Sequence, residues 1–281
     1  MTGYYMVRSF DHAGYYETRL IMMLVAFGVA CYALRRKRDP RYFVMLISGV
    51  FFQGLMEYIL QATGLRGAGY HFSVFGISMS GVWANLFQGL AEGAIFSLMA
   101  FWFVDLKTGE NPAISWKGFV AAYALIVALS AVVGVLAAGQ PITSPRPMFG
   151  TATVWWLAGT AGPALLLGAW KHGLRYVGYF FIGLFIYSFV TFEPLQILGA
   201  RYIGVRTSTG GLEPAPFLAQ AGIMLYSHIV EVSAQKMHYF AVPFALGLLP
   251  PASLSPAERL HLLLANGKMR VLDVPPSARK P

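Results

Sequence analysis

Hydrophobic residues in this chain occur in seven long blocks, separated by short segments that are rich in charged residues, glycine and proline. Each block is near or above the roughly 20 residues that an α-helix needs to cross the hydrocarbon core of a bilayer. The pattern predicts transmembrane helices over residues 18–34, 42–64, 80–104, 118–138, 151–170, 176–199 and 217–249. Pro243 is expected to kink or end the last helix, because proline lacks the backbone N–H that a helix interior needs.

Composition agrees with this pattern. Hydrophobic residues make up 57% of the 281 residues and charged residues 12%, about half of the roughly 25% that is usual in a soluble domain. Residues 1–17 lack the apolar core and cleavage site of a signal peptide, so none is expected. The sequence predicts an all-α, multi-pass protein of the cell membrane. It consists of one seven-helix domain over residues 1–250 and a short basic tail over residues 251–281.

Positive charge alternates from one connection to the next. Lysine and arginine gather in residues 35–41, 107–117 and 171–175 and in the tail. The opposite connections hold fewer cations, which are Arg66, Arg146, Arg201 and Arg206. The positive-inside rule assigns the richer set to the cytoplasm. We therefore expect the N-terminus outside and the C-terminus inside, and the net charge of +9 needs no nucleic-acid partner to explain it.

Four glutamates fall inside predicted spans, each on a different helix. They are Glu57, Glu92, Glu193 and Glu231. A charged side chain at the centre of a membrane helix costs about 2.5–3.5 kcal/mol on insertion scales, and such residues usually mark a functional site. Each glutamate has polar companions at successive steps of three or four residues, which share its helical face. These companions are Gln53, Gln61, Asn85, Gln88, Gln196, His228, Gln235 and His238.

Helical depth suggests where these groups meet. With a rise of about 1.5 Å per residue, Glu92 and His228 fall near the middle of their spans. Glu57 and Glu193 fall slightly outward, and Glu231 slightly toward the cytoplasm. We therefore expect all five to line one cavity and to be the catalytic residues.

Two further ionisable residues of the last span are expected outside this cavity. A regular helix places Lys236 about 140° away from Glu231 around its axis. Lys236 and His238 are thus assigned to the cytoplasmic mouth. The remaining polar companions are expected to form hydrogen bonds between helices and to hold their register.

The chemistry follows from carboxylates that are shielded from water. Such groups share protons, so that some are protonated and others ionised at neutral pH. A protonated glutamate can protonate an alkene or epoxide, and a second carboxylate or His228 can then remove a proton or direct water. The predicted function is an integral membrane enzyme (an isomerase, a cyclase, or a lyase of the hydratase type) without a cofactor. Its substrate is expected to be a lipophilic small molecule, such as an isoprenoid, sterol or carotenoid-like lipid of the membrane.

This arrangement resembles that of emopamil-binding-type sterol isomerases and membrane-bound meroterpenoid cyclases, which also place acids inside a helical bundle. Two alternatives use the same residues. In the first, His228, Glu231 and Glu92 hold a single iron or zinc ion in a membrane hydroxylase or hydrolase. In the second, the buried acids serve a proton-coupled transporter or a small-ligand receptor. No internal repeat of the kind common in transporters is evident. The substrate and the oligomeric state stay open.

Overall fold

The computed structural model describes residues 3–63, 71–109, 112–170, 174–208, 210–249 and 258. Six helical segments of this part are long and apolar enough to cross a membrane. They are α1 (Tyr15–Lys37), α2 (Arg41–Ala62), the unit Gly81–Thr108, α5 (Trp116–Leu136), α7 (Leu174–Ile197) and the unit Phe217–Ala245. A further apolar helix, α6, covers Thr151–Trp170. The mostly helical membrane-protein class is thus confirmed, and the helices lie within a few residues of the predicted blocks.

Two of these segments are composite. The first consists of α3 (Gly81–Gln88), the π-helix η1 (Gly89–Gly93) and α4 (Ala94–Thr108). The second consists of α8 (Phe217–Tyr226), the π-helix η2 (Ser227–Ser233), the 3₁₀ turn η3 (Ala234–Lys236) and α9 (His238–Ala245). The predicted tail, residues 251–281, lies outside the described residues apart from Glu258.

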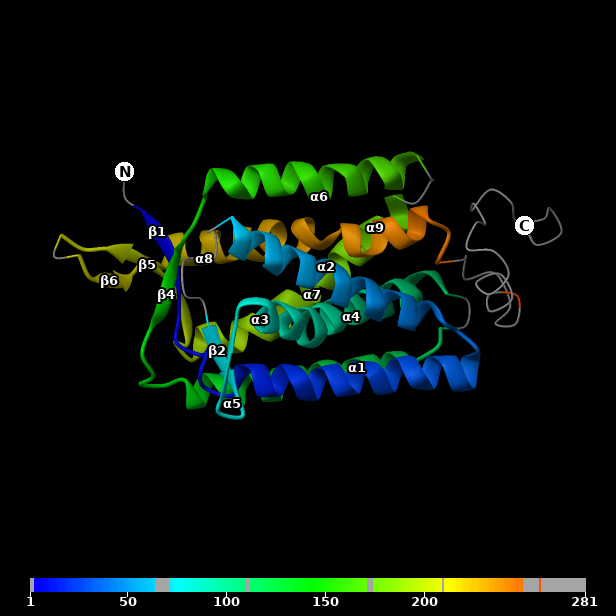
Figure 1. The fold of residues 1–281 in the computed structure, drawn as a ribbon, viewed down its shortest axis with the longest axis horizontal. Helices are drawn as coiled ribbons and strands as arrows, with labels where there is room; N and C mark the ends of the chain where they lie inside the picture. The colour runs from blue at the N-terminus through cyan, green and yellow to red at the C-terminus, as the bar shows by residue number, and fades with distance from the viewer. Residues whose placement is uncertain are drawn as a thin grey trace.

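Strands gather at one end of the bundle, the end at which the chain begins (Figure 1). An antiparallel four-stranded sheet has the order β4 (Thr143–Pro147), β1 (Tyr4–Arg8), β5 (Arg201–Arg206), β6 (Leu212–Pro214). A separate hairpin joins β2 (His71–Val74) and β3 (Ile77–Ser80). The all-α prediction is therefore incomplete. These strands are short and come from distant segments, so they pair only after the helices have brought those segments together.

The Gly81–Thr108 unit is the central helix of the bundle. Of its most apolar window, 94% is buried, against 33–39% for the other five candidate spans. Glycines let α2 pack directly against it: a Cβ added at Gly49 or Gly93 would overlap the backbone carbonyl of the other residue. Small residues of this kind allow close helix packing in membranes, where no hydrophobic force drives helices together. The contact sets Glu57, on the second predicted span, beside the third span, which carries Glu92.

Pro243 lies inside α9, which ends two residues later at Ala245. Proline cannot donate to the carbonyl four residues earlier. That carbonyl, of Tyr239, instead accepts a hydrogen bond from Ser48 Oγ on α2. The main irregularity of this span comes earlier, at η2 and η3.

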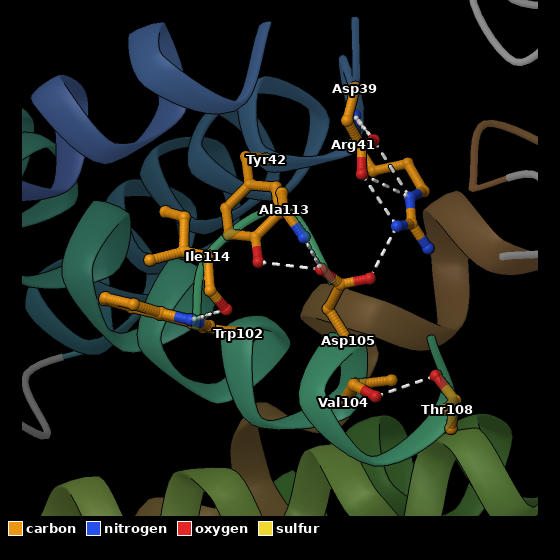
Figure 2. Close-up of polar contacts among 9 residues, drawn as sticks. All are labelled: Asp39, Arg41, Tyr42, Trp102, Val104, Asp105, Thr108, Ala113 and Ile114. Carbon is orange, nitrogen blue, oxygen red and sulfur yellow. Dashed lines mark hydrogen bonds and ion pairs between the residues drawn. The ribbon is translucent and has the colours of Figure 1, made fainter. Parts of the chain in front are cut away.

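A buried ion cluster fastens the end of the bundle opposite the sheet (Figure 2). We call it the Asp105 clasp, and it consists of Asp39, Arg41, Tyr42, Asp105 and Ala113. Arg41 Nη2 donates to Asp105 Oδ1 (2.6 Å) and to Asp39 Oδ2 (2.7 Å). The other Asp105 oxygen, Oδ2, accepts from the Tyr42 hydroxyl (3.0 Å) and the Ala113 N–H (2.9 Å). The clasp ties α2, α4 and the segment before α5 to one carboxylate.

Candidate functional site

A cavity of about 280 Å³ lies between the four-stranded sheet and the helices. Its wall comes from three strands (β1, β4 and β5) and from α1, α2, η1, α4, α6, α7, η2 and η3. The wall combines apolar and aromatic side chains with an unusual number of charged ones. The charged residues are Arg8, Glu57, Glu92, Arg146, Arg201, Glu231 and Lys236.

The predicted site residues divide into two groups. Glu57, Glu92 and Glu231 line this cavity. Glu193 and His228 do not line it and instead bond to one another next to it. The structure therefore brings three of the five expected residues together in the cavity wall and places the other two beside it.

Backbone geometry explains part of the difference. Glu92 lies in the π-helix η1, and both His228 and Glu231 lie in the π-helix η2. A π turn closes i→i+5 hydrogen bonds and is frequent at functional sites. It shifts residues off the faces that a 3.6-residue period predicts.

The structure also differs from the prediction for Lys236. The π-helix η2 and the 3₁₀ turn η3 lie between Glu231 and Lys236, so the separation of about 140° expected in a regular helix does not apply. Lys236 is 6% exposed, lines the cavity, and its Nζ lies 5.1 Å from the centre of the Phe96 ring. It is thus part of the cavity wall, whereas the sequence predicted it outside the cavity. His238 packs its ring against Phe52 and Tyr239 outside the cavity wall.

Glu57 is fully buried on α2 and belongs to a short hydrogen-bonded relay. Gln53 Nε2 donates to Glu57 Oε1 (3.0 Å), and the Tyr239 hydroxyl donates to Gln53 Oε1 (2.7 Å). The relay holds the Gln53 amide at both ends, with its oxygen toward Tyr239 and its nitrogen toward Glu57. Glu57 therefore receives a neutral N–H donor in a defined position.

Glu92 has a cationic neighbour on the first helix. Arg19 is 2% exposed and interacts electrostatically with Glu92. Its guanidinium lies 4.4 Å from the centre of the Tyr15 ring, and its Nη1 donates to the Tyr187 hydroxyl (3.3 Å). Arg19 lies within the first predicted span, and an arginine there is itself a signal that sequence analysis could have used.

Glu231 is anchored to the sheet. Arg146 of β4 donates Nη1 to Glu231 Oε1 (2.9 Å) and Nη2 to Oε2 (2.7 Å), a bidentate pair. Ser227 Oγ adds a hydrogen bond to Oε2 (3.0 Å), and Arg201 Nη2 donates to Ser227 (3.1 Å). Glu231 lies at the middle of the Phe217–Ala245 segment, where a residue of the sheet reaches it. Its carboxylate holds β4 against η2 through the ion pair with Arg146.

His228 occupies a separate polar row on α7 and η2. Its Nδ1 lies 2.6 Å from Ser188 Oγ, and its Nε2 lies 3.0 Å from Glu193 Oε1. Both ring nitrogens are thus engaged, and Glu231 is engaged by Arg146. Within the described ranges, no group of three or more His, Cys, Asp or Glu side chains is placed to hold a metal ion. The geometry therefore does not suit the ligand set His228, Glu231 and Glu92 of the metalloenzyme alternative.

Comparisons with known protein families, with curated proteins and with solved structures find no match for this chain. The geometry of the cavity is therefore the basis for a proposed function.

The cations of this cavity are not among the residues that the sequence predicts for the site. Arg8, Arg146 and Arg201 come from segments that were expected to be loops, and they enter the wall because those segments form β1, β4 and β5. One signal was present. Arg146 and Arg201 are two of the few cations in the connections that the predicted topology places outside. The positive-inside rule does not account for cations in those connections.

Proposed function

We propose that this chain is an integral membrane enzyme that uses Glu57 and Glu92 for acid/base chemistry on a lipid bound in the cavity. The reaction is an isomerisation, cyclisation or hydration, and the substrate is an isoprenoid, sterol or carotenoid-like molecule. One observation carries the proposal: a fully buried acid, Glu57, and a half-buried acid, Glu92, lie on two closely packed helices and line the same partly apolar cavity. Pairs of acids in different surroundings take different protonation roles.

The surroundings suggest the roles. The positive charge of Arg19 compensates an ionised Glu92, which suits a base. Glu57 is fully buried and accepts from the neutral amide of Gln53, and we assign it the role of the acid. Tyr15, Phe96 and Phe192 give the cavity an aromatic wall, and aromatic faces stabilise a carbocation.

A double-bond isomerisation illustrates the chemistry. Glu57 transfers its proton to one alkene carbon and leaves a cation on the adjacent carbon. Glu92 then removes a proton from the next carbon, and the electrons of that C–H bond form the new double bond. Glu57 ends ionised and Glu92 protonated, so a proton transfer from Glu92 to Glu57 restores the starting state.

The proposal includes seven spans with the N-terminus outside. The 20 residues of α6 supply the seventh span, and four segments expected outside lie together at the sheet end (Figure 1). Reporter fusions after Arg41 and Leu174 should read cytoplasmic, and a fusion after Gly210 external. Reversal of any of the three would contradict this topology.

Glu92→Gln tests the function. The amide fills the same volume but cannot exchange a proton, so turnover should fall by about 10² or more. Membrane lipids from cells with wild type or Glu92→Gln are compared by mass spectrometry, with Glu213→Gln, on the exposed strand β6, as the matched control. A product formed by wild type and Glu213→Gln but not by Glu92→Gln supports the enzyme. Identical lipid profiles with all three proteins folded would contradict it.

One observation favours a second candidate, a proton-coupled transporter. The row Ser188–His228–Glu193 lies deep on α7 and η2, and it connects hydrogen-bonding groups across two helices. A transporter would lose proton-coupled uptake in His228→Gln, whereas the proposed enzyme would keep its turnover because His228 does not line the cavity.

A further inference from the structure

Arg201 is a buried cation in the cavity wall without a carboxylate against it. It is 6% exposed and lines the cavity from the first position of β5. Its Nη2 donates to Ser227 Oγ (3.1 Å), its Nε lies 3.2 Å from Met6 Sδ, and its guanidinium lies 4.3 Å from the centre of the Phe192 ring. Throughout the described ranges, no carboxylate comes within ion-pair distance of Arg201.

Burial in this position has a cost. Desolvation lowers the pKa of Arg201 to about 10, and the charge of Glu231 beyond Ser227 offsets only part of that effect. The guanidinium is nevertheless charged at neutral pH. A buried charge without a direct counter-charge is strongly unfavourable, so a ligand that brings a negative charge to this wall gains the compensation that the protein does not supply.

The neighbouring charges favour the same conclusion. Arg146 is paired with Glu231, and Arg8 Nε lies 3.1 Å from Asp11 Oδ2. Lys236 adds another cation across the cavity. The charged residues of the cavity wall are thus four cations and three carboxylates.

The apolar part of the cavity wall favours an amphiphilic ligand. Apolar side chains of α2, α4, α6 and η2 face the same space, and they include Met56, Leu60, Phe96, Trp156 and Val232. Arg201 follows the end of α7, at the sheet end of the bundle, the depth at which a lipid head group lies if the sheet is at the membrane surface. The planar guanidinium matches carboxylate and phosphate oxygens, which it can bind with two parallel hydrogen bonds.

We propose that the ligand of this cavity is an amphiphile whose anionic, oxygen-rich head group, a carboxylate or a phosphate, binds Arg201 while its apolar part extends toward Glu57 and Glu92. The inference deepens the proposed function and rests on it for the reaction, but binding can be measured without turnover.

The test uses the full-length chain in nanodiscs of zwitterionic phosphatidylcholine, with empty nanodiscs to correct for partitioning. Equilibrium binding is measured for dodecyl phosphate, dodecanoate, dodecanol and inorganic phosphate. At least one of the two anionic amphiphiles should bind about tenfold or more tightly than dodecanol, a factor that corresponds to one charge-assisted hydrogen bond. The tighter of the two identifies the head group. Equal binding of dodecanol, or binding of inorganic phosphate as tight as that of dodecyl phosphate, would overturn the proposal.

Variants locate the head group. Arg201→Gln should abolish the preference for the anionic amphiphile, and Arg206→Gln, at the exposed end of the same strand, should retain it. Arg201→Lys keeps the charge and should retain part of the preference, so it replaces Arg201→Gln if that variant does not fold. Preference unchanged in both Arg201 variants would overturn the assignment.

Different results would contradict the proposed enzyme activity and the proposed anionic ligand. Glu92→Gln should bind dodecyl phosphate or dodecanoate as wild type does while producing no lipid product. Loss of product with binding intact therefore supports both proposals. Turnover in a protein that binds no anionic amphiphile would overturn this inference and leave the enzyme in place.

Discussion

The two ends of the bundle each bury arginine, carboxylate and tyrosine side chains, yet they use them differently. In the Asp105 clasp, Arg41 has two carboxylates, and both Asp105 oxygens have donors (Figure 2). At the sheet end, charged groups surround a cavity of about 280 Å³, and Arg201 has neutral partners. A fully satisfied network contributes to the stability of the fold. A network arranged around a cavity, with a cation lacking its counter-charge, keeps the capacity to bind a ligand.

The largest expected effect is on stability, at the clasp. Asp105→Ala leaves Arg41 with one carboxylate and removes the acceptor of Tyr42 and Ala113. Breaking a buried ion pair in this way costs about 3–5 kcal/mol. The free energy of unfolding in detergent should fall by that amount, with Glu213→Ala at an exposed position as the control. A loss under about 1 kcal/mol would contradict the structural role of the clasp.

The second prediction concerns Glu57 in the cavity, where a substitution should lower turnover and not stability. Glu57→Gln should lower turnover by about 10² or more, because it removes the proposed acid. It should leave the free energy of unfolding nearly unchanged or higher, since a neutral amide is easier to bury than a carboxylate. Turnover of lipid and unfolding in detergent are measured on the same preparations. A stability loss as large as that of Asp105→Ala, with turnover retained per folded molecule, would assign Glu57 to the scaffold.

The third prediction concerns the pair that joins the sheet to the helices. Arg146 is 42% exposed at its side chain and Glu231 is 7% exposed, so solvent screens part of their attraction. A double-mutant cycle with Arg146→Gln and Glu231→Gln should give a coupling energy of about 1 kcal/mol, the upper range for exposed pairs. Either variant should reduce turnover less than Glu57→Gln does. A coupling energy near zero would mean that the pair does not hold β4 on η2.

The helices could be predicted from the sequence because each apolar block is continuous and bilayer-length, and hydropathy alone decides that property. The four-stranded sheet could not. Its strands β1, β4, β5 and β6 have three to six residues each and come from segments far apart in the chain. Their pairing depends on the helices between them, which no local pattern encodes.

The candidate site was predictable in part for a related reason. Carboxylates inside apolar blocks stand out, and so Glu57, Glu92 and Glu231 were found. The π-helices η1 and η2 interrupt the regular period, and so Lys236 was assigned to the wrong face. Arg201 lies outside every predicted span, and its role depends on a strand that hydropathy does not reveal.

The smallest effect is expected for the relay behind Glu57. The Tyr239 hydroxyl donates to Gln53 Oε1, and this bond keeps the Gln53 amide N–H directed at Glu57. Tyr239→Phe removes one hydrogen bond between membrane helices, which averages about 0.6 kcal/mol of stability. The amide then loses its fixed orientation, and a loss of about 1 kcal/mol at the transition state corresponds to roughly a fivefold lower kcat. KM should stay unchanged, because Tyr239 does not line the cavity.

Tyr58→Phe, an exposed position on the same helix as Gln53, is the matched control and should change neither kcat nor KM. An unchanged kcat in Tyr239→Phe would show that the orientation of Gln53 does not matter to the acid. A raised KM with unchanged kcat would instead mean that Tyr239 acts on substrate binding. The relay therefore provides a test of whether Glu57 is the acid that does not require substituting Glu57 itself.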